Sequence, residues 1–465
     1  MNVTIIGTGY VGLTTAVTFA YLGHLVTCLD INKGKIEKLR SGQSPFYEPG
    51  LEYIMKISGQ RLTYTSNYAE ATLCADIIFI AVGTPPNEDG SPNLTYINEA
   101  FESIMTNLKS NDKKVVIVNK STVPIGTTQK LQERLILSNL GSRAVMASNP
   151  EFLRQGRAVH DTLYPDRIVI GGDNFSIKIL KQLYQPIIEQ SFVAPKGIQR
   201  PKGLNQVQLI AVDRFSAELG KYAANAFLAM KISFINEMSS VCDKVGADIN
   251  NVAKIIGTDP RIGEKFLQAG IGYGGSCFPK DTRALHYIAE SNGYSFKLMS
   301  AVIEVNNRQK FVIISKLKEA LGKLKGQKIA VLGLTFKPDT DDLREAPSIP
   351  IIYALINEGA EVSAHDPVAL EKAILQLPSK VYFSDSIKDI VRDADAIVLL
   401  TEWEQYKIID WLNIGSFMRK KILIDGRNAL NGDNLENIGY EYYGIGRHNA
   451  KRKMPMYEEN ISELM

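Results

Sequence analysis

The sequence predicts an α/β protein with two doubly wound parallel-sheet domains, joined by a long central helix and a helical middle region. Strand-like and helix-like runs alternate over the first part of the chain, the same plan returns from residue 328, and a long helix-like segment lies between them. Alternating β and α runs are typical of parallel sheets covered by helices on both faces, so both domains are expected to be Rossmann-like. We place a dinucleotide domain at 1–212, a helical region at 213–321 and a second α/β domain at 322–465.

Length and composition exclude several classes of protein. A chain of 465 residues is too long for one ordinary core. Lys plus Arg is 53 and Asp plus Glu is 50, so the net charge of +3 gives no argument for nucleic acid or a membrane surface. No apolar run approaches the ~20 residues of a membrane span. The four cysteines form no CxxC pair, so we expect reduced thiols, no metal site and a cytoplasmic protein.

The first strand, expected at residues 2–6, leaves no room for a signal peptide and leads into a glycine turn. Gly7, Gly9 and Gly12 form a GxGxxG sequence before a helix at 13–22, and the next strand, 25–29, ends at Asp30. This context is typical of a dinucleotide-binding turn, whose helix N-terminus binds phosphates. Asp30 would bind ribose hydroxyls and repel a 2′-phosphate, which favours NAD over NADP. The alternative is a glycine turn in an unrelated α/β unit.

Three further strand ends carry polar residues. The expected strands are 76–82, 115–119 and 144–148, and they are followed by Thr84, Thr122 and Glu151. Each could be a helix cap or a turn residue. Ligands of parallel sheets bind beyond the carboxyl ends of the strands, so three such residues together favour a lined crevice. Residues 174–212 are hard to interpret, and 196–208 is expected to be a surface excursion without an assigned function.

A long helix is expected from about residue 213 to 244, ending at Gly246. Apolar residues at helical spacing predict its buried stripe as Leu219, Tyr222, Ala223, Ala226, Phe227 and Met230. Lys221 and Asn225 are four residues apart and share a face. Because so much of this helix is apolar, we expect the pair to line a cavity, the alternative being a solvated lysine and a tolerated asparagine. A short helix at 248–256 and a long one at 297–321 are also expected.

In residues 270–281, GIGYGGSCFPKD, a glycine-rich run is followed by a cysteine and then by Pro-Lys-Asp, which is expected to form a turn. Glycines permit close approach of the backbone to a ligand. Cys277 is expected just before a helix at 282–290 and beside Lys280, where positive charge favours the thiolate, the nucleophilic form. The alternative is a small buried apolar residue in a loop.

The last third repeats the plan of the first. Strands are expected at 328–332, 361–364, 394–400 and 421–424, with a helix at 349–358. This half lacks GxGxxG, so we do not assign the dinucleotide to it. Lys337, Arg344 and Arg427 make it a candidate for another phosphate-bearing ligand, although basic surface residues are common. The polar tail from 451 is expected to be mobile.

Together these motifs resemble the UDP-glucose/GDP-mannose dehydrogenase family over nearly the whole chain. The matching sequences are GTGYVG, VGTPP, KSTVPIGTT, SNPEFLRQG, ELGKYAANAFLAMKISFINE, GYGGSCFPKD and GLTFKPDTDDLREAPS. The Cys-Phe-Pro-Lys-Asp form is similar to the UDP-glucose branch. The resemblance implies oxidation of UDP-glucose to UDP-glucuronate, a four-electron reaction that uses two NAD+ per turnover. The alternatives are a dehydrogenase for GDP-mannose or another UDP-hexose, and a catalytically silent nucleotide-sugar or NAD-binding regulator.

The resemblance also implies roles for catalytic residues. Cys277 would attack the aldehyde to form a thiohemiacetal, which is oxidised to a thioester and hydrolysed. Lys221 and Asp281, through a bound water, would remove the alcohol proton and stabilise oxyanions, and Asn225 would hold the same oxygen.

Two more residues belong to this implied set. Glu151 would assist hydrolysis, and Thr122 would order the water. One departure from the family is Gln155, which stands where many members have a second glutamate. Glutamine cannot act as a base, so an obligatory proton role at this position would impair the protein, but we expect a structural or tuning role.

The remaining site residues are carried over from the resemblance. NAD contacts are implied for Gly7, Gly9, Tyr10, Val11, Gly12, Asp30, Lys35, Thr84, Pro85, Thr122, Lys280 and Arg344. Contacts with the UDP-sugar are implied for Glu151, Phe152, Leu153, Lys221, Asn225, Arg261, Phe266, Tyr273, Gly274, Lys337 and Arg427. Arg261 resembles an arginine that reaches the substrate of a neighbouring subunit, and the long helix implies a homodimer or a higher homo-oligomer.

Overall fold

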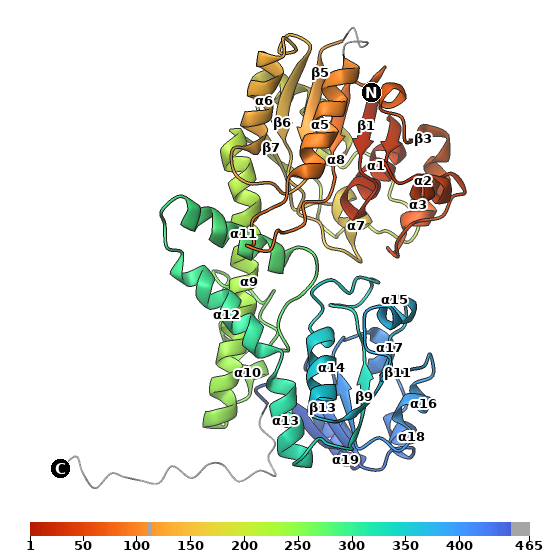
Figure 1. Cartoon of the computed structure of the whole chain (residues 1–465), viewed down its shortest axis with the longest axis vertical. Coiled ribbons are helices and arrows are strands. Elements are labelled where there is room, and N and C mark those ends of the chain that lie inside the picture. The colour runs from red at the N-terminus through yellow and green to blue at the C-terminus, as the bar shows by residue number, and fades with distance from the viewer. Residues whose placement is uncertain (109–112, 448–465) are drawn as a thin grey trace, which may run out of the picture. The chain divides into compact units, whose positions relative to one another are not determined.

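The computed structural model describes residues 1–108 and 113–447, and the expected mobile tail lies outside these residues. The chain forms two compact units (Figure 1). Unit 1 contains residues 1–224 and 283–292, and unit 2 contains 225–282 and the described part of the chain from 293 onward. Each unit is built around a largely parallel sheet, and helical segments lie between the two sheets in the sequence, so the predicted fold class is confirmed.

The sheet of unit 1 has eight strands in the order β3-β2-β1-β4-β5-β6-β7-β8. The strands are β1 Asn2–Ile6, β2 Leu25–Leu29, β3 Leu62–Thr65, β4 Ile77–Ile80, β5 Val115–Asn119, β6 Ala144–Ser148, β7 Arg167–Gly171 and β8 Gln208–Val212. Neighbouring strands are parallel except for β6 and β7, which pair antiparallel. The first six have the strand order of dinucleotide-binding sheets.

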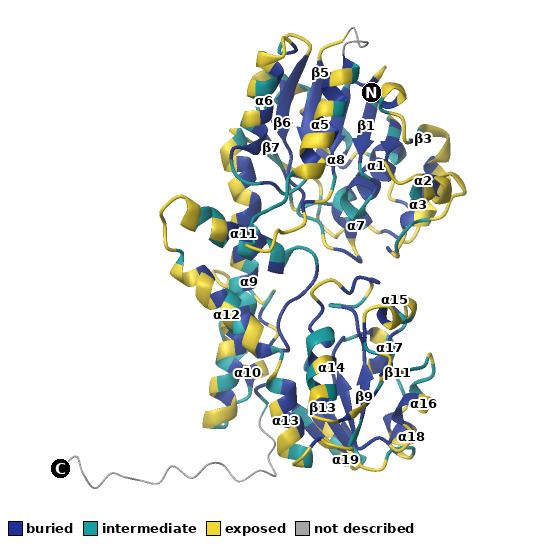
Figure 2. Cartoon of the chain, in the orientation of Figure 1, coloured by how far each residue is buried: buried dark blue, intermediate teal, exposed yellow. Residues whose placement is uncertain are grey.

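Helices cover both faces of this sheet. They are α1 Tyr10–Tyr21, α2 Lys33–Arg40, α3 Leu51–Ser58, α4 Tyr68–Thr72, α5 Thr95–Asn107, α6 Thr127–Leu137, α7 Ala158–Leu163 and α8 Asn174–Ile188, with a 3-10 turn at Gly59–Arg61. One core places α1 and α8 against β1, and the other places α5 and α6 against the opposite face. Every residue of β4 and β5 is buried, as expected for strands covered on both sides (Figure 2).

Residues 174–212, which are hard to interpret from the sequence, contain one helix, α8, and one strand, β8. Helix α8 begins where the Asp173 carboxylate accepts a hydrogen bond from the Ser176 backbone N–H, and β8 ends the stretch at Val212. The expected surface excursion at 196–208 is anchored to the unit, because Ile198 and Val207 are buried. Their side chains join the apolar clusters beside α1, which a reading of the polar residues alone does not reveal.

The middle of the chain is helical. It contains α9 Arg214–Val245, α10 Ile249–Gly257, α11 Phe278–Ser291, α12 Lys297–Gln309 and α13 Val312–Leu321. The single helix expected over 297–321 is wrong, because the chain leaves the helical path between α12 and α13. Helix α11 begins at Phe278, so the Pro-Lys-Asp sequence forms its first turn. Proline is accepted there because the first turn needs no backbone donor.

The buried stripe predicted for α9 is only partly correct. Tyr222 and Ala226 are buried, but Leu219 and Phe227 are 45% and 59% exposed, and Ala223 is also exposed. Phe234 extends the exposed side at 52%. We call Leu219, Ala223, Phe227, Met230 and Phe234 the outer apolar stripe, since their spacing of three or four residues places them on one side of the helix.

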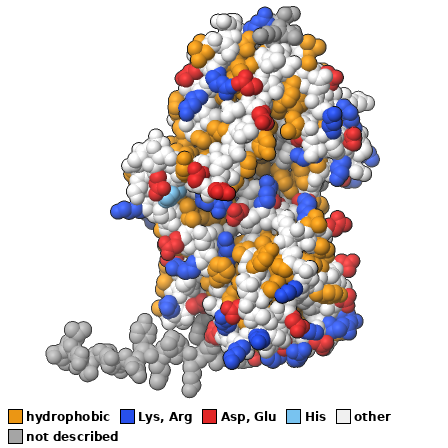
Figure 3. All heavy atoms as spheres, in the orientation of Figure 1, with side chains coloured by type: hydrophobic (Ala, Val, Ile, Leu, Met, Phe, Trp, Pro, Cys, Tyr) orange, Lys and Arg blue, Asp and Glu red, His pale blue; other side chains and the backbone are white. Residues whose placement is uncertain are grey.

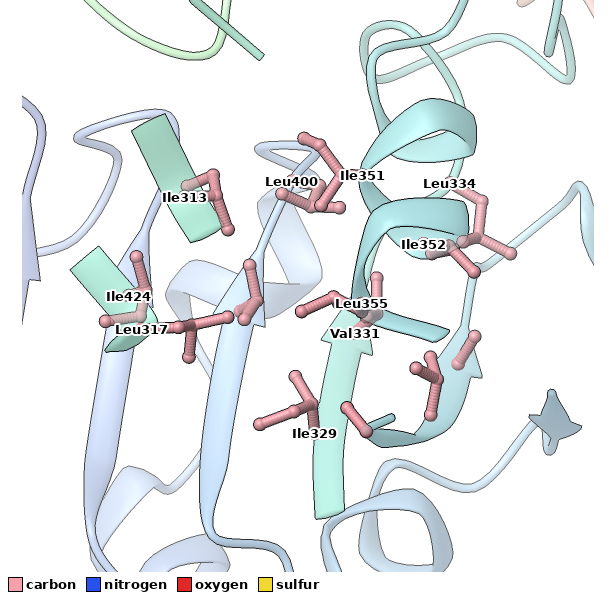
Figure 4. Packing of buried hydrophobic residues seen from close by; sticks show 14 of the residues in the cluster. Ile313, Leu317, Ile329, Val331, Leu334, Ile351, Ile352, Leu355, Leu400 and Ile424 are labelled. Atoms are coloured by element: carbon pink, nitrogen blue, oxygen red, sulfur yellow. The ribbon is translucent and has the colours of Figure 1, made fainter. Parts of the chain in front are cut away.

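The sheet of unit 2 has six parallel strands in the order β11-β10-β9-β12-β13-β14. The strands are β9 Lys328–Leu332, β10 Glu361–His365, β11 Tyr382–Phe383, β12 Ala396–Leu399, β13 Ile422–Asp425 and β14 Glu441–Gly444. The helices around it are α14 Ser348–Asn357, α15 Leu370–Ile374, α16 Ile387–Val391, α17 Glu404–Lys407, α18 Trp411–Gly415 and α19 Gly432–Asn437. Figure 4 shows α13 and α14 side chains packed on β9 and β13.

The predicted internal repeat is confirmed down to single hydrogen bonds. The Asn2 backbone N–H donates to the Asp76 carboxylate at 2.8 Å, and the Lys328 N–H donates to Asp395 at 2.9 Å. In both sheets an aspartate just before the fourth strand therefore fixes the start of the first strand. The glycine that ends the first strand has positive φ in both cases, +95° at Gly7 and +89° at Gly333.

Candidate active site

In unit 1 the turn between β1 and α1 forms an open cradle. Gly7 adopts φ +95°, which favours glycine. A Cβ on Gly12 would lie 1.8 Å from the Gly7 carbonyl oxygen, so this position requires glycine for close packing of the helix against the turn. A Cβ on Gly9 would meet nothing within 4 Å. The first and third glycines therefore serve packing, and the second leaves space above the N-terminus of α1, where an anionic phosphate fits.

Asp30 closes this cradle at the end of β2. Its Oδ2 accepts hydrogen bonds from the Thr8 backbone N–H at 2.9 Å and the Thr8 hydroxyl at 2.7 Å, and Oδ1 accepts from the Asn32 N–H at 3.0 Å. Burial raises the pKa of Asp30, but these hydrogen bonds and the Lys35 ammonium outweigh burial and hold the pKa below its usual value. Asp30 is therefore an anion at neutral pH, suited to accept hydrogen bonds from ribose hydroxyls.

The ends of β4 and β5 also meet at this edge of the sheet. The Thr84 hydroxyl donates to the Thr122 carbonyl oxygen at 2.9 Å, which links the segments after the two strands. Thr84 is buried, whereas Pro85 is exposed. Tyr10, at the start of α1, packs against Phe46 with ring centroids 4.0 Å apart. Both residues of this aromatic pair are partly exposed, so they offer a surface beside the cradle.

A buried ion pair joins α9 to the segment after β6. Lys221 Nζ lies 3.0 Å from Glu151 Oε1, and both side chains are almost fully buried. Glu151 Oε2 accepts a hydrogen bond from the Leu153 N–H at 2.7 Å, and the Lys221 ammonium lies 5.3 Å from the centre of the Phe152 ring. The alternative of a solvated lysine is therefore wrong. This arrangement can hold a proton or stabilise negative charge in a site that excludes water.

Lys120 is a buried residue of this region that the sequence reading did not single out. Its Nζ donates to Asn149 Oδ1 at 3.1 Å and to the Tyr184 hydroxyl at 3.4 Å. Burial lowers the pKa of Lys120 to about 8, with Glu151 raising it and Lys221 lowering it further. Its only sequence signal is its place after β5, in the KSTVP motif, directly before the segment that carries Thr122.

In unit 2 the residues Asn225 and Asp281 form a buried polar pair. Asn225 Nδ2 donates to Asp281 Oδ2 at 2.6 Å, and the Lys280 ammonium contacts the other carboxylate oxygen. Asp281 is 1% exposed. Lys221 and Asn225 therefore use adjacent turns of α9 for different partners, Glu151 and Asp281, and both side chains are buried. The cavity that the pair is expected to line stays a prediction.

Cys277 stands at the N-terminus of α11, as predicted. Its carbonyl oxygen accepts the first helical hydrogen bond, from the Asp281 N–H at 2.8 Å, so Cys277 is the capping residue. The side chain is partly exposed, unlike the buried Cys28 and Cys242. A partly exposed thiol at a positive helix end is the environment of a reactive cysteine.

Two of the predicted sugar-nucleotide residues of unit 2, Phe266 and Tyr273, pack against Phe278, the residue after Cys277. The ring of Tyr273 meets that of Phe278 edge-on, with centroids 5.9 Å apart, and Phe266 lies 6.1 Å from Phe278. A Cβ on Gly274 would lie 2.3 Å from the Glu345 carbonyl oxygen, so the loop approaches its neighbour closely at this position. Lys337 is partly exposed.

Arg427 makes a set of contacts that were not predicted. Its Nε donates to the Leu400 carbonyl at 2.9 Å, Nη1 to Gly272 at 3.0 Å and Nη2 to Phe336 at 3.0 Å. Three of its five N–H groups therefore hold backbone carbonyls of three loops. A guanidinium fixed in this way is pre-organised, and its charge is partly balanced by Glu402, whose Oε2 lies 3.4 Å from Nε.

Two other predicted arginines are paired with nearby acids. Arg261 is exposed and forms a two-pronged contact with Asp259, while Arg344 forms one with Asp342. Their contacts with ligands stay predictions. Gln155 is buried beside the Arg154–Asp161 ion pair, and its role also stays a prediction. Within residues 1–108 and 113–447, no group of three or more His, Cys, Asp or Glu side chains could hold a metal ion.

Sequence comparison assigns each part of the chain to one family. The family descriptions are UDP-glucose/GDP-mannose dehydrogenase NAD binding domain for residues 1–188, central domain for 215–308 and UDP binding domain for 330–432. The chain is 45% identical over 452 residues to the UDP-glucose 6-dehydrogenase YwqF of Bacillus subtilis, a match that covers 96% of this chain and 98% of YwqF. It is 42% identical over 463 residues to a UDP-glucose 6-dehydrogenase of Pseudomonas aeruginosa, covering 97% and 98% of the two chains.

Solved structures agree with this assignment. A UDP-glucose dehydrogenase from Pyrobaculum islandicum matches with a TM-score of 0.84 and 36% identity over 96% of this chain and 98% of that one. A UDP-D-ManNAc dehydrogenase from Pyrococcus horikoshii matches with a TM-score of 0.81 and 28% identity, over 96% and 100%. With a dinucleotide cradle, a cysteine-capped helix and similarity along its whole length, this chain belongs to the UDP-glucose/GDP-mannose dehydrogenase family.

Proposed function

We propose that this protein oxidises C6 of UDP-glucose to the carboxylate of UDP-glucuronate, with two NAD+ reduced per turnover. The observation that carries the proposal is Cys277, a partly exposed thiol that caps α11 in the sequence Cys-Phe-Pro-Lys-Asp. Relatives more than 40% identical over nearly the whole chain are named UDP-glucose 6-dehydrogenases, which supports this substrate.

The residues of the β1–α1 turn fit NAD. Gly9 leaves open space above the α1 N-terminus, and the anionic Asp30 is placed to bind ribose hydroxyls and to repel a 2′-phosphate. We assign the pyrophosphate to the glycine turn, with Tyr10, Val11, Lys35, Thr84, Pro85 and Thr122 as further contacts. When bound, NAD+ accepts the hydride that leaves C6. Lys280 and Arg344 are proposed to lie near its phosphates or nicotinamide side.

The first oxidation needs a base for the C6 hydroxyl proton. We assign this role to Asp281 acting with Lys221 through a bound water, while Asn225 donates a hydrogen bond to the C6 oxygen. The Asn225–Asp281 contact of 2.6 Å orients both groups before substrate arrives. Loss of the proton and of a hydride converts the alcohol to an aldehyde, and the Lys221 ammonium stabilises the developing oxyanion.

The second oxidation proceeds on the enzyme. The Cys277 thiolate adds to the aldehyde carbon, forming the C–S bond of a thiohemiacetal whose oxygen takes up a proton. Loss of that proton and of a second hydride gives a thioester. Water, ordered by Thr122, then attacks the thioester carbon while Glu151 accepts its proton, and the C–S bond breaks to return the thiolate. Glu151 lies in a buried environment, with one carboxylate oxygen 3.0 Å from the Lys221 ammonium.

Unit 2 supplies the proposed sugar-nucleotide site. The UDP binding domain of the family matches residues 330–432, which contain Lys337 and Arg427. We propose that these cations bind phosphate and that Phe152, Leu153, Arg261, Phe266, Tyr273 and Gly274 contact the rest of the substrate. This gives the division into 1–212 for NAD, 213–321 for assembly and Cys277, and 322–465 for the UDP-sugar.

We also propose that two copies associate through α9. The outer apolar stripe exposes Leu219, Phe227 and Phe234 along one helix, and burial of such residues against a second copy removes apolar surface from water. A two-fold axis would bring the same stripe from each copy together.

The test is the number of NADH formed per sugar nucleotide consumed. UDP-glucose, GDP-mannose and UDP-N-acetylhexosamines are compared in parallel, and we expect about two NADH per UDP-glucose with little signal from the others. One NADH would mean release of the aldehyde, and preference for another sugar would replace the substrate. No NADH from folded protein that binds NAD would contradict the proposal and favour a silent binder.

Cys277→Ala is the matching variant. We expect it to abolish acid formation, because no thiohemiacetal can form, while NAD affinity stays within about twofold. Cys74→Ala, which removes an exposed thiol of unit 1 without an assigned role, is the control and should keep wild-type turnover. Normal acid formation by Cys277→Ala would exclude the covalent mechanism.

A further inference from the structure

The loop that leads to Cys277 is held by buried side-chain amides from two helices of unit 2. Asn236 of α9 accepts a hydrogen bond from the Gly270 N–H at 2.9 Å, and Gln309 of α12 donates to the Gly270 carbonyl at 2.8 Å. Both amide residues are buried. The first residue of the glycine run is therefore fixed on both its backbone groups by side chains far away in the sequence.

Asn306, one turn before Gln309 on α12, holds the same loop four residues before the cysteine. Its Oδ1 accepts from the Tyr273 N–H at 2.8 Å, and its Nδ2 donates to the Tyr273 carbonyl at 3.1 Å. Asn306 is 5% exposed. One amide thus satisfies both backbone groups of Tyr273, a geometry that needs a donor and an acceptor on one short side chain, which only asparagine supplies at this length.

Gly272 shows how closely the amide fits the loop. This glycine adopts φ +89°, and a Cβ on it would lie 2.5 Å from Asn306 Oδ1. Its carbonyl accepts the hydrogen bond from Arg427. Glycine at 272 and asparagine at 306 are therefore complementary, because a side chain at 272 would overlap the Asn306 amide. The Tyr273 ring contacts the ring of Phe278, the residue after the cysteine, so the position of Tyr273 affects the start of α11.

We propose that Asn306 is a positioning residue that sets the place of Cys277 through the Tyr273 backbone. The inference rests on the proposed function, because it assigns Asn306 a part in the same covalent step, which its side chain serves through hydrogen bonds to the loop backbone. Without the amide, two buried backbone groups lose their partners and the loop can take other paths. A nucleophile displaced by about 1 Å reacts some 10²-fold more slowly.

The experiment compares Asn306→Ala, Asn306→Asp and Asn307→Ala in the full-length protein. Asn307 is the next residue of α12 and is exposed, so it provides the same chemical change without the loop contact. We expect Asn306→Ala to lower kcat/KM for UDP-glucose about 10²-fold and to yield fewer than two NADH per sugar, because the aldehyde escapes before the thiol captures it. NAD affinity should stay within about twofold. Asn306→Asp keeps the acceptor but cannot donate, so its loss should be intermediate.

A second measurement does not need turnover. The rate of Cys277 alkylation by iodoacetamide, resolved by peptide mass spectrometry, should change at least several-fold in Asn306→Ala and remain unchanged in Asn307→Ala, with Cys74 as the internal reference. If Asn306→Ala does not fold, Asn306→Asp carries both measurements. Unchanged alkylation and two NADH per sugar in a variant that only has a lower Tm would overturn the proposal. Failure of the proposed function appears separately, as wild-type protein without UDP-glucose turnover.

Discussion

Lys120 carries a charge in the interior of unit 1. Its ammonium is buried and has two hydrogen-bond partners, Asn149 and Tyr184, neither of which is a carboxylate. A buried cation without a directly bonded anion favours loss of its proton, and burial accordingly lowers its pKa from 10.5 to about 8. Because its charge also acts on Glu151 and Lys221, Lys120 contributes to the electrostatic environment of that ion pair.

Lys120→Met should therefore have a pH-dependent effect on stability. Below pH 8 the lysine is protonated in the folded and unfolded states, and the full cost of burying the charge is present. Between about pH 8 and 10.5 the unfolded state binds more protons, so the wild type gains stability relative to Lys120→Met as pH rises. The gain should reach about 3 kcal/mol, from ~1.4 kcal/mol per pKa unit.

Urea unfolding of both proteins at pH 7, 8, 9 and 10 measures this difference. Lys178→Met, at an exposed lysine of α8, serves as the control, and its difference from wild type should change little. A flat difference for Lys120→Met over the same pH range would show that the Lys120 charge is not destabilised by burial.

Among the elements, the β1–α1 turn separates the packing of the fold from the binding of the cofactor. At Gly12 the missing side chain is needed by the protein itself, because a Cβ would overlap the Gly7 carbonyl. At Gly9, the residue before α1, the surrounding space is open. The same short sequence thus contains one glycine required by the backbone and one available to a ligand.

Gly12→Ala and Gly9→Ala should differ in what they lose. Gly12→Ala forces the start of α1 away from the turn, and we expect it to lower the free energy of unfolding by several kcal/mol, since overpacking usually costs about 1–3 kcal/mol and here meets rigid backbone. Gly9→Ala should keep wild-type stability but weaken NAD binding at least tenfold. Thermal unfolding and NAD titration of both variants check this, with Gly59→Ala as control, because a Cβ there also meets nothing within 4 Å. Equal loss of stability in Gly12→Ala and Gly9→Ala would contradict the assignment of Gly12 to packing and of Gly9 to cofactor binding.

At the scale of the whole molecule, the outer apolar stripe of α9 exposes large hydrophobic side chains on the surface of the chain. Basic and acidic side chains are interspersed over the face in Figure 3, in keeping with 53 basic and 50 acidic residues. No described helix is long and apolar enough to cross a membrane. We therefore propose that the exposed apolar residues of α9 are buried against the same stripe of a second copy of the chain.

Phe227→Glu should dissociate the proposed dimer. Each phenylalanine buried in an interface stabilises it by roughly 1.5–3 kcal/mol, and a two-fold axis places two copies in the interface, so the dissociation constant should rise at least 10²-fold. Sedimentation velocity over a concentration series measures it. Lys244→Glu, at an exposed polar position near the end of the same helix, is the control and should leave the assembly unchanged. An unchanged sedimentation profile for Phe227→Glu would place the interface elsewhere.

Features that depend on a few neighbouring residues could be predicted from the amino-acid sequence. Strand–glycine–helix order, Asp30 after the second strand, and Cys277 before a helix are all patterns within a few residues, and the structure has them in the predicted order. The helix after Cys277 begins at Phe278, four residues earlier than expected, because Pro-Lys-Asp is accepted in a first helical turn. The repeat of the plan in the second sheet followed from the same periodicities, because a parallel strand buried on both faces needs a continuous apolar run.

Which side of α9 is buried within the chain depends on the packing of distant segments against it. Apolar residues lie on several sides of this helix, so periodicity alone could not separate Tyr222, which is buried, from Phe227, which is exposed. The partners of Lys120 and Asn306 come from segments distant in sequence, and such side-chain hydrogen bonds leave no local signature. They arise because the folded chain buries polar backbone and charged groups that must find partners in three dimensions.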